Sequence, residues 1–296
     1  LRLLEGPEGE RWWSGKIGEG GVQMGGVGQT WQPGTREDFG EAELHELLRS
    51  ESASVVPCGL ACRRWHFGSL DDALSGNANR AFHILHEKRG KKKDDPIPDP
   101  KNKGYTVKTF FELATTARRK YKDENGQLPK LLHWPLENSG LEEQLDMPTW
   151  LKEENWLWLP KDGKPLKSIS RLGDTFKVKL QLVHAHQSTF NHRDNNGTDT
   201  YMKPLVGKVL VATYSQEDGV KYKLHEEPDD ADELTHMNWS LFHQMPSARL
   251  FLLRKGDVLL MPSGTFHFVY TVDTKVVLAG DFMNGVGWAR REASVQ

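Results

Sequence analysis

A series of short apolar runs in the C-terminal half most constrains what this chain can fold into. Several of these runs alternate apolar with polar residues, the period of a β-strand that buries one face. Gly, Pro, Asn and Asp residues separate the runs. Short strands repeated in this way favour a β-sandwich or a β-barrel. We expect the strands at residues 176–185, 204–214, 248–262, 266–272 and 275–283.

The N-terminal half has a different character. Residues 1–36 are rich in glycine and no strand precedes their glycine runs, so we expect a flexible leader there. The periodicity of residues 37–50 predicts one helix, and a capping box at Thr109 and Glu112 predicts a second. We therefore predict three parts: the leader 1–36, a mixed α/β part 37–150 that packs on the core, and a β core 151–296.

A polar run from Glu87 to Lys103 is broken by prolines, which predicts an exposed loop. Its basic stretch 88–93 could serve as a nuclear import signal or bind phosphate. The neighbouring Asp94 and Asp95 are more typical of a solvated loop. The roles of this stretch and of the glycine-rich leader stay open.

Composition limits the compartment and the partners. The formal net charge of −2 gives no global basic field, so nucleic acid binding would need a local patch. Cys58 and Cys62 are too few for a disulfide framework, and their spacing is not that of a zinc site, even with His66 nearby. No apolar run approaches the roughly 18 residues of a membrane span. We expect an intracellular protein, nuclear or cytoplasmic, without a membrane segment.

Two metal ligands are indicated by the H-x-D motif of His192 and Asp194. On an extended chain, residues two apart project from the same face, so both side chains can reach one ion. Two histidines and one carboxylate, with coordination positions left open, are typical of non-haem Fe(II) oxygenases. The third ligand has to come from a distant strand. His267 is the candidate, and a Gly-Asp turn, an apolar strand and a bend that contains proline precede it.

A second histidine pair offers a competing site. His184 and His186 have the H-x-H spacing of a cupin-type Zn or Mn isomerase and would share one face of a strand. No suitably spaced glutamate accompanies them. A packing role, or support of the neighbouring ligands, suits this pair better.

Together the segments 189–194 and 256–269 resemble the signature of the JmjC family of 2-oxoglutarate-dependent dioxygenases. The resemblance spans about residues 174–284 and includes the Gly207-Lys208 step. It implies a mainly β fold with helical additions around a double-stranded β-helix, the jelly-roll core of the cupin superfamily. It also implies Fe(II), 2-oxoglutarate and O2, with release of succinate and CO2.

The resemblance also implies a role for individual residues. His192, Asp194 and His267 would ligate Fe(II). Lys208 would pair with the distal carboxylate of 2-oxoglutarate, and Thr189 would donate a hydrogen bond to that carboxylate.

Two positions depart from the family pattern. Asn191 stands where an aromatic residue often precedes the first histidine, and Val209 stands where the lysine often lies. Lys203 is therefore an alternative anchor for 2-oxoglutarate. If residues 204–214 form one strand with Val206 facing inward, Lys208 shares that inward face and Lys203 does not, which favours Lys208.

These expectations describe an enzyme that hydroxylates or demethylates a protein or another macromolecule. A protein or peptide, chromatin and nucleic acid all stay open as partners, because selectivity resides in the loops around such a core. Two alternatives belong to other classes: a cupin-type metal isomerase and a catalytically silent JmjC-like binding module. A silent module has no physical need to keep three inward ligands, which disfavours it. The sequence makes no prediction of the oligomeric state.

Overall fold

A computed structural model of the 296-residue chain describes residues 54–57, 66–67, 81–82, 105–106, 131–136, 145–146, 178–194, 198–224, 238–255 and 257–283. The expected leader, both expected N-terminal helices, the basic stretch 88–93 and the two cysteines lie outside these residues. The predicted division into three parts therefore stays a prediction.

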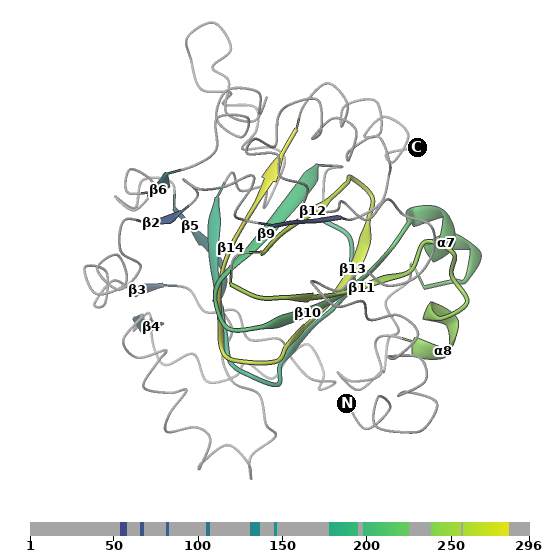
Figure 1. Ribbon diagram of the computed structural model, residues 1–296, viewed down its shortest axis with the longest axis horizontal. Coiled ribbons are helices and arrows are strands. Elements are labelled where there is room, and N and C mark those ends of the chain that lie inside the picture. Colours follow the sequence, from purple (N-terminus) through teal and green to yellow (C-terminus); the bar gives the residue numbers. More distant parts are fainter. Residues whose placement is uncertain are drawn as a thin grey trace, which may run out of the picture.

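The described residues are mostly β, consistent with the expected β-rich, cupin-like fold (Figure 1). A six-stranded sheet runs in the order β1 (Ser54–Pro57), β12 (Asp257–Met261), β9 (Asp199–Val206), β14 (Lys275–Phe282), β7 (Lys179–Val183) and β5 (Leu131–Pro135). A four-stranded sheet runs in the order β11 (Arg249–Leu253), β10 (Val209–Tyr214), β13 (Phe266–Thr271) and β8 (Ser188–His192). Neighbouring strands in both sheets are antiparallel.

Two further ladders are short. The strand β2 (His66–Phe67) pairs with β6 (Leu145–Asp146), and β3 (Ala81–Phe82) pairs with β4 (Tyr105–Thr106).

An apolar core lies between the two large sheets. It combines residues of β9, β12 and β14 with residues of β10, β11 and β13. Burial of apolar surface in such a core is the main favourable contribution to the free energy of folding. The members of this core are Met202, Val209, Val211, Phe251, Leu253, Leu259, Met261, Val269, Val277 and Ala279.

A second apolar cluster covers the other face of the four-stranded sheet. Leu210, Ala212 and Tyr214 alternate with the inner residues of β10 and pack with Phe242 and Phe266. Because both faces of β10 are covered, all six of its residues are buried, and the strand reads as a nearly continuous apolar run.

Two short helices lie together beside the four-stranded sheet (Figure 1). The Ser215 side chain caps α7 (Gln216–Lys221), and the Asn238 side chain caps α8 (Trp239–Phe242). No helix among the described residues has the length and apolar character needed to cross a membrane.

The expected strand at 204–214 is wrong, because a sharp turn at Gly207 divides it between the two sheets. Gly207 has a φ of +82°, and a Cβ there would lie 2.4 Å from the carbonyl oxygen of Thr274. Only glycine fits this left-handed, closely packed position. The Lys208 carbonyl accepts hydrogen bonds from the backbone N–H groups of Val272 and Asp273, which fixes the turn against the next connection.

The expected strand at 176–185 is shorter than predicted. The strand β7 ends at Val183, and a turn follows in which His186 has a φ of +66°. His184 and His186 therefore do not share a strand face, contrary to the prediction. The expected run 248–262 comprises two strands, β11 and β12, in different sheets.

Candidate metal centre

The structure brings His192, Asp194 and His267 together at one end of the space between the sheets. His192 is the last residue of β8 and lies directly opposite His267 in the β8–β13 ladder. The two rings have centroids 4.2 Å apart, and the ladder has a register shift between His267 and Val269. One potential ligand atom from each of the three residues lies within 4.8 Å of the others. This group could hold one metal ion.

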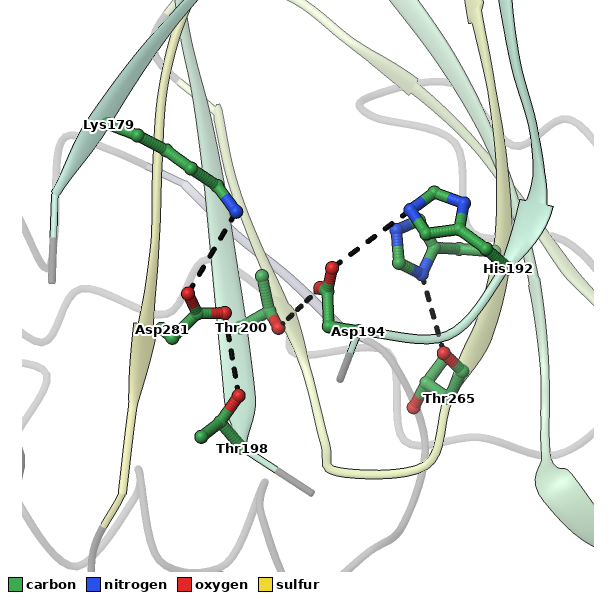
Figure 2. A network of polar contacts seen from close by, with 8 residues as sticks. Lys179, His192, Asp194, Thr198, Thr200, Thr265 and Asp281 are labelled. Atoms are coloured by element: carbon green, nitrogen blue, oxygen red, sulfur yellow. Dashed lines mark hydrogen bonds and ion pairs between the residues drawn. The ribbon is translucent and has the colours of Figure 1, made fainter. Parts of the chain in front are cut away.

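The Asp194 carboxylate is oriented by a residue that the sequence did not indicate. The Thr200 hydroxyl on β9 donates a hydrogen bond of 2.7 Å to Oδ2 of Asp194 (Figure 2). The other oxygen, Oδ1, lies 4.0 Å from Nε2 of His192. Thr200 therefore holds one carboxylate oxygen and leaves the other directed toward the histidines, a type of support common around metal sites.

His267 is buried and lies 3.4 Å, through Nδ1, from the backbone carbonyl oxygen of Thr265. A proton on Nδ1 would donate to that carbonyl and leave Nε2 free to ligate. Burial, with a further contribution from His192, lowers the pKa of His267 to about 4. The ring is therefore neutral at pH 7, which is the form that binds metals.

Asp194 keeps its negative charge. Burial by itself would raise the pKa of this carboxyl. The charges of protonated His267, of Lys179 and of protonated His192, together with the hydrogen bond from Thr200, outweigh burial and lower the pKa of Asp194 below its ordinary value. The carboxylate and the neutral imidazole are both in the state that a divalent metal requires.

The three residues line a cavity of about 70 Å³. Its other polar lining comes from β7, β8, β9 and β14, namely Lys179, Gln181, Thr189, Thr200 and Lys275. Its apolar lining is Met202, Met261, Val269 and Ala279. Thr189, a residue that the sequence singled out, thus lines the same cavity as the three candidate ligands.

Neither lysine that the sequence offered as an anchor lies in this cavity. The Lys208 side chain is 51% exposed and pairs with Asp273 at 3.4 Å. The inward orientation predicted for Lys208 is therefore wrong. The prediction assumed that Val206 and Lys208 lie two residues apart in one strand, and the turn at Gly207 interrupts that strand. Lys203 is buried, but it adjoins Met202, which lines the cavity, and so projects from the opposite face of β9.

Lys179 and Lys275 are the lysines that line the cavity, and the sequence indicated neither of them. In β7, Lys179 and Gln181 line the cavity, whereas Leu180 and Leu182 are buried on the other face. The sequence of β7 alternates polar with apolar residues. Because both faces of the strand are buried, this alternation could not identify which face lines the cavity.

Asn191, which departs from the family pattern, faces away from the cavity. Its amide nitrogen donates to the Tyr214 hydroxyl and, at 2.9 Å, to the backbone carbonyl of Leu224. The Tyr214 hydroxyl donates to the same carbonyl at 2.9 Å. Asn191 thus anchors the chain after α7 to the strand that ends in His192.

The H-x-H pair does not form a metal site with the other described residues. His184 is buried, whereas His186 is exposed on the turn, and its Nδ1 lies 3.0 Å from the Tyr270 hydroxyl. Within the part of the chain that the structure describes, the group of potential metal ligands is His192, Asp194 and His267.

Comparison with known proteins gives a distant similarity. The chain is similar to a JmjC protein. It is 22% identical over 194 residues to the JmjC domain-containing histone demethylation protein 1 of Caenorhabditis briggsae. The match covers 61% of this chain and 18% of that protein's length. No family model matches the chain. The similarity supports the resemblance to the JmjC family.

Proposed function

We propose that this chain is an Fe(II)- and 2-oxoglutarate-dependent dioxygenase with a double-stranded β-helix core. The observation that carries the proposal is the convergence of His192, Asp194 and His267 on one side of a cavity, with ligand atoms within 4.8 Å of one another. Two imidazoles and one carboxylate suit Fe(II) and leave positions for other ligands. The neutral His267 and the ionised Asp194 fit the metal chemically.

When bound, Fe(II) with 2-oxoglutarate and O2 supplies the oxidation of a C–H bond, with release of succinate and CO2. The chain's own residues prepare the site for that chemistry. Thr200 and the Thr265 carbonyl orient two of the ligands, which keeps the coordination geometry fixed before a substrate arrives. Met202, Met261 and Val269 line the cavity with apolar surface, which keeps water away from the reacting groups.

The two alternatives are less well supported. A cupin-type isomerase built on His184 and His186 lacks a shared ligand face, because His186 lies on an exposed turn. A silent binding module would not need Thr200 and the Thr265 carbonyl to orient ligands.

We propose a protein substrate that is hydroxylated or demethylated, since both outcomes begin with the same C–H oxidation. The name of the similar protein, a histone demethylation protein, motivates chromatin as the substrate and the nucleus as the compartment. The net charge of −2 gives no global electrostatic attraction to nucleic acid. A nucleic acid substrate is therefore less well supported than a protein substrate.

The test is an anaerobic titration with Fe(II) and 2-oxoglutarate, followed by a succinate assay in air with panels of histone peptides, other peptides and nucleic acids. The proposal expects one Fe(II) per chain and iron-dependent succinate release that a peptide stimulates. Stoichiometric metal binding without succinate formation under any condition would favour the silent module or the isomerase.

A further inference from the structure

Two buried lysines share the cavity with the candidate metal ligands. Lys275 is the first residue of β14 and is 1% exposed, and Lys179 is the first residue of β7 and is 5% exposed. Both line the cavity. Burial of an ammonium group is costly unless an anion compensates it. Two buried lysines therefore make the cavity favourable for an anionic group.

Lys179 belongs to the metal end of the cavity. Its ammonium lies 3.9 Å from Oδ2 of Asp281, and Asp281 accepts a hydrogen bond from the Thr198 hydroxyl (Figure 2). Its charge also acts on Asp194 and lowers that carboxyl's pKa. Lys179 thus pairs with Asp281 and acts on Asp194, one of the candidate metal ligands.

Lys275 lies at the opposite end of the cavity. The strand β13 carries His267 near its start, at the metal end, and ends at Thr271. The short connection 272–274 then leads directly into Lys275. In the β7–β14 ladder, Lys179 is opposite Ala279, four residues beyond Lys275, a separation of roughly 13 Å along a strand. The two lysines therefore serve different ends of one cavity.

Thr189 lies between the metal ligands and Lys275. In the β8–β13 ladder it is opposite Val269, on the side of His267 that leads toward Lys275. Both Thr189 and Val269 line the cavity. The end away from the metal therefore offers a cation and a hydroxyl, the groups that bind a carboxylate by charge-assisted hydrogen bonds.

A dianion suits this arrangement as the ligand, because the candidate metal site and Lys275 would place positive charge at both ends of the cavity. A five-carbon 2-oxo diacid carries two negative charges and can present one carboxylate to each end of the cavity.

We propose that Lys275, together with Thr189, binds the distal carboxylate of 2-oxoglutarate, in place of Lys208. This inference rests on the proposed function, since it concerns the co-substrate of the same site. Lys208 is excluded from this role by its exposed position and its pairing with Asp273. The anchor thus comes from β14 and not from the turn between β9 and β10.

The experiment compares two 2-oxo acids that differ only in the distal group. Calorimetry on the Mn(II)-loaded full chain measures binding of 2-oxoglutarate and of 2-oxopentanoate, which lacks the distal carboxylate. The variants are Lys275→Met, which keeps side-chain length without charge, and the matched control Lys208→Met on the exposed turn. Mn(II) affinity is measured separately for each protein.

Lys275→Met should weaken 2-oxoglutarate binding by more than roughly tenfold and change 2-oxopentanoate binding by less than about twofold. Mn(II) affinity should stay within about twofold, and Lys208→Met should match the unmodified chain. Lys275→Arg, which restores the charge, should recover part of the preference for the diacid.

Three results would overturn the assignment. An unchanged preference for 2-oxoglutarate in folded, Mn(II)-binding Lys275→Met would remove Lys275 as the anchor while leaving the proposed function intact. Loss of the preference in Lys208→Met, or in Lys179→Met alone, would assign the anchor elsewhere. If the unmodified chain binds Mn(II) but neither 2-oxo acid, the proposed function fails, and the inference fails with it.

Discussion

His192 and His267 lie directly opposite each other in the β8–β13 ladder, with ring centroids 4.2 Å apart. Their closeness is a product of strand pairing, because residues opposite each other in an antiparallel ladder have neighbouring side chains. We predict that His192→Ala and His267→Ala each reduce the stoichiometry of Co(II) binding from one per chain to near zero, by titration of the purified protein.

The control for this titration is His186→Ala. His186 is exposed on the turn before β8 and contacts Tyr270 through Nδ1, so its loss should leave the Co(II) stoichiometry at one. A loss of Co(II) in His186→Ala equal to that in His267→Ala would place the metal at the H-x-H pair.

Thr200→Val tests the support of the carboxylate ligand. Valine keeps the shape of threonine but removes the hydrogen bond of 2.7 Å to Oδ2 of Asp194. Loss of such a support commonly weakens metal affinity by roughly 10 to 100-fold. A competition titration with a chelator should find a weakening in this range. Thr198→Val, which removes a hydrogen bond to Asp281 instead, should have the smaller effect, and equal effects would contradict the role given to Thr200.

The pH dependence of stability should reflect His267 in the metal-free protein. Burial lowers the pKa of His267 from 6.5 to about 4, so the unfolded chain binds the proton more tightly than the folded chain. Stability should therefore fall as pH decreases from about 6.5 to about 4, by up to an amount on the order of 3 kcal/mol. Asp194, with a lowered pKa, contributes to loss of stability only below its ordinary value of 3.8.

Urea unfolding at a series of pH values, after treatment with a chelator, measures this dependence. His267→Gln should flatten the curve between pH 4 and 6.5. An unchanged slope in that variant would show that another group is responsible.

Gly207→Ala tests the turn that separates β9 from β10. A positive φ costs a non-glycine residue about 1 to 3 kcal/mol, and a Cβ would also lie 2.4 Å from the Thr274 carbonyl oxygen. Gly264 has a similar φ of +81°, but the nearest atom to its Cβ belongs to the flexible Gln216 side chain, at 3.0 Å. Gly207→Ala should therefore lower the free energy of unfolding more than Gly264→Ala, by chemical denaturation. Equal losses would show that the backbone next to Gly207 moves away readily.

Local patterns predicted much of the site. The H-x-D spacing and the histidine after the Pro-containing bend identified three residues that the structure brings together. Thr189, chosen for its position before the first histidine, lines the same cavity. The mainly β character of the described residues followed from the short apolar runs.

Other features depend on how the sheets enclose the cavity, which local patterns do not report. A single glycine divides an otherwise uninterrupted apolar run between two sheets. The alternation of side chains between strand faces does not continue across Gly207, so it gave the wrong orientation for Lys208. Lys275 is the first residue of β14, a mostly apolar strand whose residues are all buried. The local sequence does not distinguish the face of this strand that lines the cavity. Thr200 contacts Asp194 only because β9 passes beside the end of β8.

The most direct test of the central claim is the formation of succinate from 2-oxoglutarate under air, with and without Fe(II). The unmodified chain should form succinate only when Fe(II) is present, and Asp194→Ala should form at most about one hundredth as much while it keeps its β-sheet circular dichroism. Equal succinate formation by Asp194→Ala, or none by the unmodified chain with any peptide or nucleic acid present, would contradict the claim.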